Sequence, residues 1–514
     1  MDPSKLHVAV DQKKKFEYAR KRAGLVLAPL VFLVVWWLPI PGLADNAHRL
    51  LAIAGLTITL WATEAIPLPI AALLGPVLCV AMAVAPTKAV FQGFSDPIIF
   101  VFLGSFMLAE AMFVHGLNKR IAYRILGLKW VGESPLRLLL AFGGTGAFLS
   151  MWISNTLCTA MLCPVALTIL AEMARRRSIE KGVEVRPADL RFGTGLILLT
   201  GFGPAVGGMG TPIGTPPNLI AVSLINQNAK VPILFFDWVM FTTPILLILL
   251  VLLVVYLNRV YSAEAGVMRG SVAWIQAEQA KLGPMSRAEK NVTWALAITG
   301  TLWLLPSIPP LLGGTDSAIY QYFSRYMPTS VAAIIGATLL FVLPVDLRTC
   351  QFTLSWKEAK QIDFGTILLF GGGLALGDLM FTTGLSEWVG GRLSNAMNTH
   401  TTLGLVTMFT LVSAAISQVA SNTAAAAMVV PIAIAVAQAA GVNAVQPALA
   451  AALGASLGCM LPISTPPMAI VYSSGCVPLG SMAREGFVVL VVGAVVVIAS
   501  VMYVVPAIIP IAAK

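Results

Sequence analysis

Two short polar motifs, Ser154-Asn155-Thr156 and Ser421-Asn422-Thr423, recur inside apolar, proline-containing segments of the chain. The residues after them also match, with Ala, Met, Pro and Ala at equivalent positions. The N-terminal amides of a helix carry partial positive charge and bind anions. Hydroxyls and an amide beside such a helix end would form a neutral cradle for a carboxylate. Two such cradles suit a ligand with two anionic ends.

A second repeated pattern, Thr-Pro-Pro, follows each motif at 215–217 and at 465–467. Proline has no backbone donor, so carbonyl groups around it are left free. Matching interrupted hydrophobic segments in two halves of a chain indicate a transporter binding site. One isolated Ser-Asn-Thr in a helix would most simply be a packing device. Its repetition together with the paired proline segments favours a binding role.

A co-bound cation is predicted from what surrounds the motifs. Neither apolar segment that carries a motif, 138–173 or 402–440, contains Lys or Arg, so another positive charge must offset a bound anion. Ser150 and Ser417 each lie one helical turn before the motif serine. Oxygen cages of the kind used for sodium would combine these hydroxyls with oxygens from Asn155, Asn422, Gly214 and Ser464.

The composition requires a membrane setting for these motifs. The chain of 514 residues is 58% hydrophobic and 11% charged, with a mean hydropathy of +0.86. These values predict an all-α polytopic membrane protein, because a spanning segment must satisfy its own backbone. The net charge of +10 is concentrated in short segments between apolar runs, which is a topology signal and argues against nucleic acid as a partner. The six cysteines form no CxxC or Cys/His cluster, so we expect no metal cluster, disulfide framework or organic cofactor.

The apolar runs predict an inverted repeat of about eleven transmembrane helices and two re-entrant hairpins. We expect a basic cytoplasmic N-terminus at 1–23, a first half at 24–258, a cytoplasmic connector at 259–290 and a second half at 291–514. The hairpins are expected at 138–173 and 402–440, with the motifs at their tips. The spans are predicted at 24–41, 48–66, 69–86, 97–117, 192–225, 238–258, 291–311, 329–345, 364–385, 446–477 and 485–510. Spans 192–225 and 446–477 are broken at Thr-Pro-Pro, and an odd number of crossings puts the N-terminus inside and the C-terminus outside.

The motif segments resemble the divalent anion/sodium symporter family, whose members include sodium-coupled di- and tricarboxylate transporters of the INDY type. The resemblance is carried by the segments FLSMWISNT (148–156), GTPIGTPPN (210–218) and LPISTPPMAIVY (461–472). It implies a homodimer in which each protomer has a scaffold and an elevator-type transport domain. It implies one sodium site at Ser150, Ser154, Asn155 and Gly214, and a second at Ser417, Ala420, Asn422 and Ser464. The implied substrate contacts are Ser154, Asn155, Thr156, Ser421, Asn422, Thr423, Thr215, Pro216, Thr465 and Pro466.

The second half departs from the family pattern at Met468, where an asparagine is usual, and at Cys459, where an aromatic residue is usual. We therefore expect the second cation to be held more loosely, with Ser150→Ala weakening sodium dependence more than Ser417→Ala. The departures also leave open an exchange of anions without sodium.

Taken together, these features predict a secondary active transporter in the cell membrane. The leading prediction is sodium-coupled symport of C4-dicarboxylates such as succinate, malate and fumarate, with membrane lipid as surroundings and no nucleic acid partner. The alternative is a sodium-independent exchanger of dicarboxylates, tricarboxylates or tartrate. A sulfate symporter or an anion channel is a weaker reading. An enzyme is disfavoured because the sequence offers no nucleophile–base pair.

Overall fold

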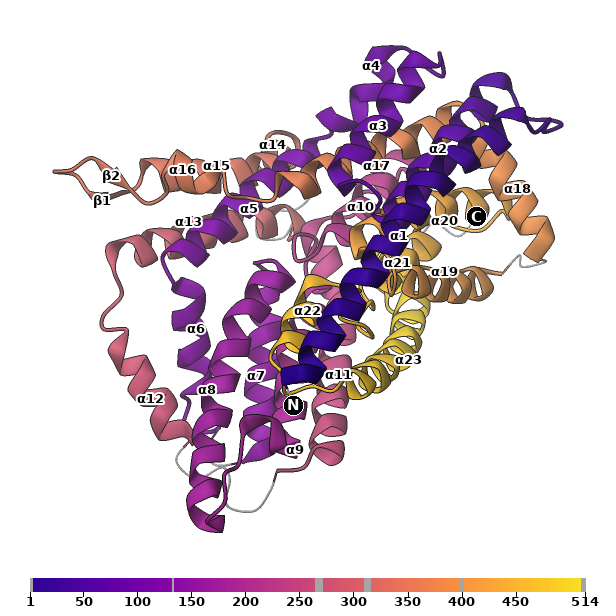
Figure 1. Ribbon diagram of the computed structural model, residues 1–514. Coiled ribbons are helices and arrows are strands. Elements are labelled where there is room, and N and C mark those ends of the chain that lie inside the picture. The colour runs from indigo at the N-terminus through magenta and orange to yellow at the C-terminus, as the bar shows by residue number, and fades with distance from the viewer. Residues whose placement is uncertain (1–2, 132–133, 264–270, 309–315, 398–400, 510–514) are drawn as a thin grey trace.

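The computed structural model describes residues 3–131, 134–263, 271–308, 316–397 and 401–509. Within these ranges the chain is nearly all helical, with one antiparallel pair of short strands, β1 (Pro344–Asp346) and β2 (Gln351–Phe352), at one end of the molecule (Figure 1). The prediction of an all-α membrane protein is confirmed. Parts of four predicted segments lie outside the described residues, namely those in 1–23, 259–290, 291–311 and 485–510.

The first half folds into helices whose bounds follow the predicted spans closely. They are α1 (Pro3–Trp37), α2 (Asp45–Thr63), α3 (Leu68–Ala81), α4 (Thr87–Val90), η1 (Phe91–Ser95), α5 (Pro97–Val114), α6 (Leu117–Leu126), α7 (Pro135–Ser150), α8 (Asn155–Lys181), η2 (Pro187–Asp189), α9 (Arg191–Gly208), α10 (Pro216–Leu224), η3 (Ile225–Ala229) and α11 (Phe235–Val260).

The connector contributes one helix and the second half repeats the plan. These elements are α12 (Ser271–Lys281), α13 (Arg287–Leu304), η4 (Leu305–Ser307), α14 (Ala318–Tyr326), α15 (Thr329–Val342), α16 (Trp356–Ala359), α17 (Phe364–Thr382), α18 (Leu385–Met397), α19 (Thr402–Ile416), α20 (Asn422–Ala439), α21 (Val445–Ala455), α22 (Pro466–Ser473), α23 (Leu479–Tyr503) and α24 (Val505–Ile508).

Three differences from the predicted bounds have local causes. Helix α1 runs through the basic segment before residue 24, because that segment contains no Gly or Pro after Pro3 to stop it. The predicted spans 97–117 and 364–385 end earlier, at Val114 and Thr382. The equivalent glycines Gly116 (φ 69°) and Gly384 (φ 79°) follow these ends in the left-handed region and begin the separate helices α6 and α18.

The two halves pack in the same way. Helix α7 packs on α9 as α19 packs on α21, and α8 packs on α9 as α20 packs on α21. Helix α11 contacts α7 as α23 contacts α19. The internal repeat inferred from the motifs is therefore also a repeat of tertiary contacts.

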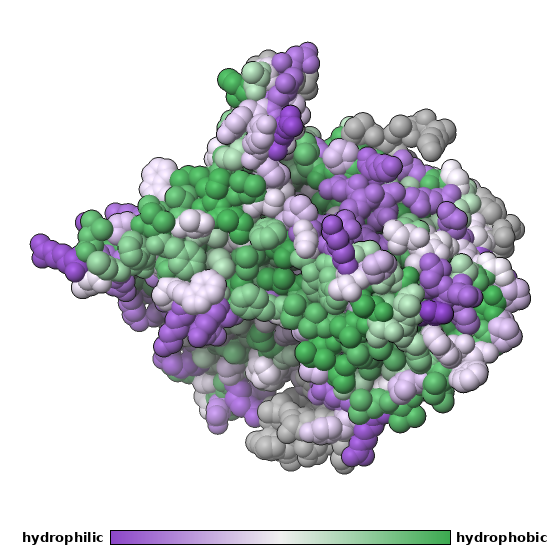
Figure 2. Space-filling view, turned by 90° about the horizontal axis from the view of Figure 1, so that it is seen from above, coloured by the Kyte–Doolittle hydropathy of each residue, from purple (hydrophilic) through white to green (hydrophobic). Residues whose placement is uncertain are grey.

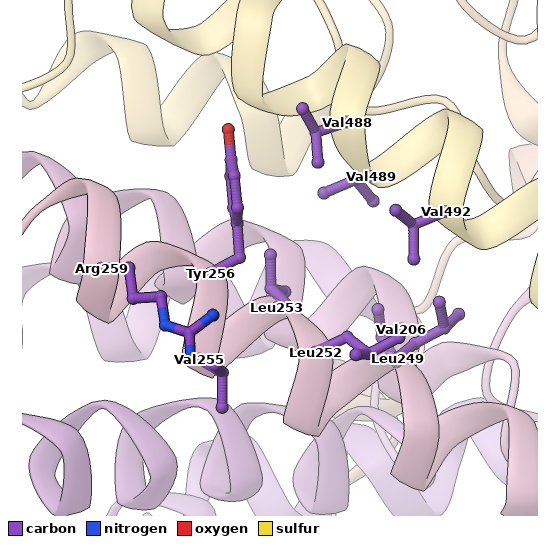
Figure 3. A pocket seen from close by; sticks show the side chains of 10 residues that line it. All are labelled: Val206, Leu249, Leu252, Leu253, Val255, Tyr256, Arg259, Val488, Val489 and Val492. Carbon is purple, nitrogen blue, oxygen red and sulfur yellow. The ribbon is translucent and has the colours of Figure 1, made fainter.

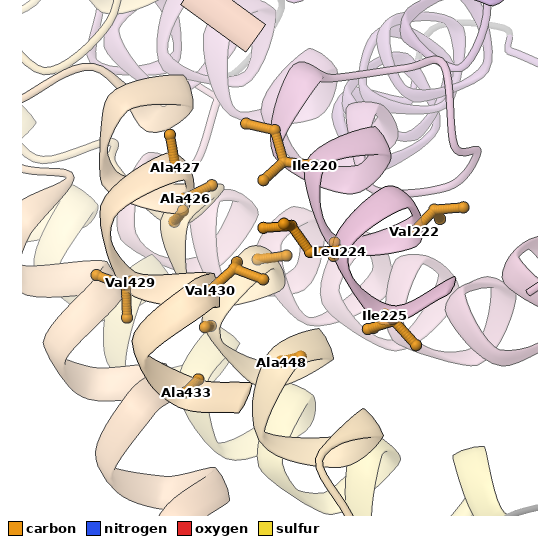
Figure 4. Close-up of a cluster of buried hydrophobic side chains, with 14 of the residues drawn as sticks. Ile220, Val222, Leu224, Ile225, Ala426, Ala427, Val429, Val430, Ala433 and Ala448 are labelled. Atoms are coloured by element: carbon orange, nitrogen blue, oxygen red, sulfur yellow. The ribbon is translucent and has the colours of Figure 1, made fainter. Parts of the chain in front are cut away.

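The halves also interlock through the broken helices. Helix α10 packs against α20, and α22 packs against α8. Figure 4 shows the first of these contacts, with Ile220 and Leu224 of α10 beside the small side chains of Ala426 and Val430 on α20. Small residues let helix backbones approach closely in a membrane protein. Each Thr-Pro-Pro helix thus lies against the hairpin helix of the opposite half.

Six helices of the described residues are long and apolar enough to cross a membrane, or up to seven if α14 and α15, which meet at 75°, form one span. Of the other predicted spans, 69–86 coincides with the shorter helix α3, and 192–225 and 446–477 coincide with the broken pairs α9–α10 and α21–α22. Large apolar side chains such as Leu252 and Trp294 are exposed on the outside, and wide hydrophobic areas are visible in Figure 2. This surface suits contact with lipid tails.

Candidate ion and substrate site

Both Ser-Asn-Thr motifs lie where a hairpin turns and its second helix begins. Ser154 caps α8 by accepting a hydrogen bond from the Leu157 amide at 3.3 Å. Ser421 caps α20 by accepting from the Ala424 amide at 3.2 Å. The backbone angles of the two serines agree closely, with φ −60° and ψ 145° at Ser154 and φ −64° and ψ 146° at Ser421. Each hairpin tip therefore presents the amide end of a helix.

A serine–asparagine pair stands behind each tip. Ser150 Oγ donates to Asn155 Oδ1 at 2.5 Å, and Ser417 Oγ donates to Asn422 Oδ1 at 2.6 Å. Ser150 and Ser417 are both fully buried. The spacing of one helical turn thus brings together the two side-chain oxygens that the sequence assigned to each cation cage.

The first proline loop lies against the first hairpin. Thr215 is extended, with φ −150° and ψ 144°, and Pro216 starts α10. A Cβ added to Gly214 would lie 2.5 Å from the carbonyl oxygen of Gly208 and 3.0 Å from that of Ser150. The backbone of Gly214 therefore lies close to the backbone of Ser150, and a side chain at position 214 would occupy space in the predicted cation cage.

The second loop has the same backbone path. Thr465 has φ −147° and ψ 152°, and Pro466 starts α22. Ser464 Oγ donates to the carbonyl oxygen of Gln418 at 3.2 Å, directly after Ser417. Ala420 is buried at the same tip. The predicted members of the second cage therefore gather around one hairpin, as those of the first do.

The predicted cation ligands are on average more buried than the predicted substrate contacts. Ser150, Ser417 and Ser464 are buried, whereas Pro466 and Ser154, which belongs to both predicted sets, are exposed. The remaining members of the two motifs are half-buried, namely Asn155, Thr156, Ser421, Asn422 and Thr423. Of the two loop threonines, Thr215 is buried and Thr465 is half-buried. This arrangement suits a cation that is bound inside each tip and an anion that binds from the exposed side of the tips.

One positively charged residue near a tip was missed by the sequence reasoning, which found no Lys or Arg near either motif. Arg20 of α1 donates to the carbonyl oxygen of Val419 at 2.9 Å and to Glu64 at 2.6 Å. Only the fold brings α1 to this hairpin. Because Arg20 is paired with Glu64, its charge is already offset, and it acts on the tip through a backbone hydrogen bond.

Two buried amide side chains were also missed. Asn218 donates to the carbonyl oxygens of Gly208 at 2.9 Å and Thr211 at 2.7 Å. Gln418 donates to the carbonyl oxygen of Leu457 at 3.1 Å. Both residues lie within the segments that carry the motifs. A polar side chain beside an apolar loop is the sequence feature that could have indicated them. Each one organises a loop that contributes to the site.

An apolar cavity between α9, α11 and α23 lies apart from the motifs. Figure 3 shows its lining, which includes Leu253, Val489 and Val492, with Tyr256 and Arg259 toward one end. Tyr256 also hydrogen-bonds the buried Glu485 at 2.5 Å. None of the predicted site residues lines this cavity. Its lining does not include the serine–asparagine pairs that lie at the hairpin tips.

Comparison with known proteins decides the family. A family model described as the sodium:sulfate symporter transmembrane region matches residues 19–509. The chain belongs to the divalent anion/sodium symporter family.

Two relatives in this family carry the same description. The sodium-dependent dicarboxylate transporter SdcS of Staphylococcus aureus (strain USA300) is 31% identical over 498 residues, which cover 96% of this chain and 93% of the relative. SdcS of Staphylococcus saprophyticus is 31% identical over 489 residues, covering 94% and 91%.

A solved structure supports the fold. The YdaH transporter of Alcanivorax borkumensis aligns with a TM-score of 0.55 at 14% identity, over 83% of this chain and 89% of that one. At this identity the likeness concerns the fold alone. Together with the apolar helices, the family places the chain among multi-pass membrane transporters.

Proposed function

We propose that this protein is a sodium-coupled symporter of a divalent organic anion, with C4-dicarboxylates such as succinate, malate and fumarate as substrates. The observation that carries the proposal is the pair of hairpin tips, each with a capped helix end and a buried serine–asparagine pair behind it. Two helix ends suit two carboxylates. The SdcS relatives, which are named as sodium-dependent dicarboxylate transporters, support the same substrate class.

The proposed roles divide the site between ions and substrate. One sodium is held by Ser150, Ser154, Asn155 and Gly214, and the other by Ser417, Ala420, Asn422 and Ser464. The anion contacts both Ser-Asn-Thr motifs together with Thr215, Pro216, Thr465 and Pro466. Burial supports the division, since the ion ligands are on average the more enclosed group.

Coupling follows from charge in this arrangement. A dianion between two neutral cradles is unfavourable in a low-dielectric site unless cations bind with it. Sodium and succinate must then raise each other's affinity by the same factor. Isothermal titration of the purified protein measures both factors, and equal factors above one are the expected result.

The movement that follows binding is proposed to be an elevator. The hairpins and broken helices form the transport domain, the other spans form the scaffold, and two protomers form a homodimer. The N-terminus is inside and the C-terminus outside the cell membrane. We expect a cysteine placed in 174–191 to be labelled only from the cytoplasm and one in 386–401 only from outside, in a background lacking the exposed Cys350. Labelling of both segments from the same side would contradict the inverted arrangement.

The decisive experiment is uptake of labelled succinate into proteoliposomes with and without an inward sodium gradient. Symport predicts accumulation only with the gradient, and the control is the same vesicles in choline buffer. Counterflow that proceeds equally well in choline would instead support the exchanger reading. Uptake of sulfate but not succinate would overturn the substrate assignment.

A further inference from the structure

We propose that Gln418 is a positioning residue for the second cation site, and that it supplies the amide which the first site obtains from Asn218. The proposal deepens the function proposed above and rests on it for the identity of the ion. The two unwound loops are held in place by hydrogen bonds from different amide side chains.

The first loop is held by an amide from the helix that follows it. Asn218 lies in the first turn of α10 and is fully buried. Its Nδ2 donates to the carbonyl oxygens of Gly208 and Thr211. The amide thereby fixes the two ends of the turn that precedes Gly214 and Thr215. Thr211 Oγ1 then joins this loop to the hairpin by donating to the carbonyl oxygen of Met151 at 2.6 Å.

The second loop cannot be held in this way, because Met468 occupies the position of Asn218. Its side chain packs on α9 of the opposite half, since a Cβ added to Gly201 would lie 2.4 Å from Met468 Cε. A thioether also offers no donor to the carbonyl groups of the loop. Another group must orient this segment.

Gln418 holds this loop instead, at other positions and from the hairpin side. Its Nε2 donates to the carbonyl oxygens of Ala414 at 2.9 Å and Leu457 at 3.1 Å. Its Oε1 accepts from the Met460 amide at 3.0 Å, and its side chain is buried. Its own carbonyl oxygen accepts from Ser464 Oγ. One residue therefore joins the hairpin tip to both sides of the loop turn.

The repeat shows that this is an exchange of positions. Gln418 lies three residues before its motif serine, as Met151 does in the first half. Met468 directly follows its Thr-Pro-Pro, as Asn218 does. Each half thus has one amide and one methionine at the same two positions, in opposite order. The second loop takes its amide from the hairpin tip, so the tip and the loop are fixed to each other directly.

The test replaces Gln418 and Met468 by the residue types that the first half has at the equivalent positions. Groups that orient metal ligands typically contribute about 10- to 100-fold to metal affinity. Gln418→Met should therefore raise the sodium concentration needed for half-maximal succinate binding by about that factor. In Gln418→Met/Met468→Asn, the second half has the methionine–asparagine order of the first, and most of the loss should be recovered. The matched control is Asn218→Met against Asn218→Met/Met151→Gln in the first half.

A readout without sodium separates this proposal from the function. Hydrogen exchange across 456–465 reports the Met460 amide directly, and Gln418→Met should accelerate it while the double variant restores protection. Gln418→Glu serves if the methionine variant does not fold: it keeps the acceptor for Met460 but loses the donor to the Leu457 carbonyl oxygen, so the sodium midpoint should still rise. Unchanged exchange in Gln418→Met, an unchanged sodium midpoint in Gln418→Glu, or no recovery in the double variant overturns the proposal. Sodium-independent binding by the wild type, with these exchange changes intact, would overturn only the proposed coupling.

Discussion

The two tips share a serine–asparagine pair but are supported by different surroundings. In the first half, α11 holds the loop with side chains, since Trp238 Nε1 donates to the carbonyl oxygen of Met209 at 2.9 Å and Thr242 Oγ1 to that of Gly210 at 3.1 Å. In the second half the backbones are in close contact instead. A Cβ added to Gly486 of α23 would lie only 2.5 Å from Met460 Cα.

The supports also differ at the hairpins themselves. Ser417 Oγ lies within hydrogen-bond distance of the carbonyl oxygen of Ala455, at 2.5 Å, as well as of Asn422. The second tip is also contacted by Arg20 through Val419. The motif geometry is therefore the same in both halves, but the side chains and backbone contacts that support it differ. Variants at equivalent positions should therefore have unequal effects wherever the supports differ.

The largest effects are expected where the halves are equivalent. Asn155→Ala and Asn422→Ala each remove an oxygen ligand and a hydrogen-bond partner. A hydrogen bond to a charged group is worth about 1.5–3 kcal/mol, so uptake should fall roughly 10- to 150-fold. Proteoliposome uptake measures the loss, and size-exclusion chromatography verifies folding. Uptake at the wild-type rate by either folded variant would contradict the site assignment.

The next test uses two equivalent glycines. A Cβ at Gly208 would lie 2.5 Å from Asn155 Oδ1, a side-chain atom, whereas one at Gly458 would lie 2.6 Å from the backbone oxygen of Ser417. A side chain moves more easily than a backbone, so Gly458→Ala should reduce sodium affinity more than Gly208→Ala.

The matched control for this pair is Gly144→Ala in α7, where an added Cβ meets nothing within 4 Å. Sodium titrations of succinate binding provide the comparison. Equal losses for Gly208→Ala and Gly458→Ala would show that the second tip is as adaptable as the first.

A smaller difference is expected between the buried serines, and here the structure changes the expectation drawn from Met468. Ser417→Ala removes a hydroxyl that lies within hydrogen-bond distance of two oxygens, Asn422 Oδ1 and the Ala455 carbonyl oxygen, whereas the Ser150 hydroxyl hydrogen-bonds Asn155 Oδ1. The single hydroxyl proton of Ser417 is shared between these two acceptors, so the extra contact is worth at most about 1 kcal/mol, or at most roughly a fivefold larger shift in the sodium midpoint. A larger shift in Ser150→Ala would restore the view that the second cation is held loosely.

The smallest effect is expected at Arg20, which contacts the second tip alone. Arg20→Gln removes the ion pair with Glu64 and the hydrogen bond to the Val419 carbonyl oxygen, and the contribution to the tip is up to about 1 kcal/mol. It should accelerate labelling of a cysteine at position 419 by at most about fivefold, in a background lacking Cys350. Arg22→Gln, exposed on the same helix, is the control and should have no effect. Equal labelling rates in the two variants would show that Arg20 does not support the second tip.

The membrane class, the repeat and the positions of the hairpin tips could all be predicted from the sequence. These features depend on local patterns, namely long apolar runs, paired Ser-Asn-Thr and Thr-Pro-Pro, and the one-turn spacing that joins Ser150 to Asn155. It also placed the helix breaks within a few residues. A serine before a helix and a proline in its first turn act through neighbouring backbone groups, so their effect can be read locally.

The segments that support the tips could not be predicted, because they come together only in the folded chain. Arg20 lies far along the chain from Val419, and Met468 contacts Gly201 of the other half, so neither contact has a local signal. The roles of Asn218 and Gln418 depend on which carbonyl groups the folded loops bring within hydrogen-bond distance. Met468 looked like a weakened second site in the sequence. In the fold Gln418 of the hairpin donates to the Leu457 carbonyl oxygen, because buried carbonyl groups require a donor but do not specify which segment of the chain provides it.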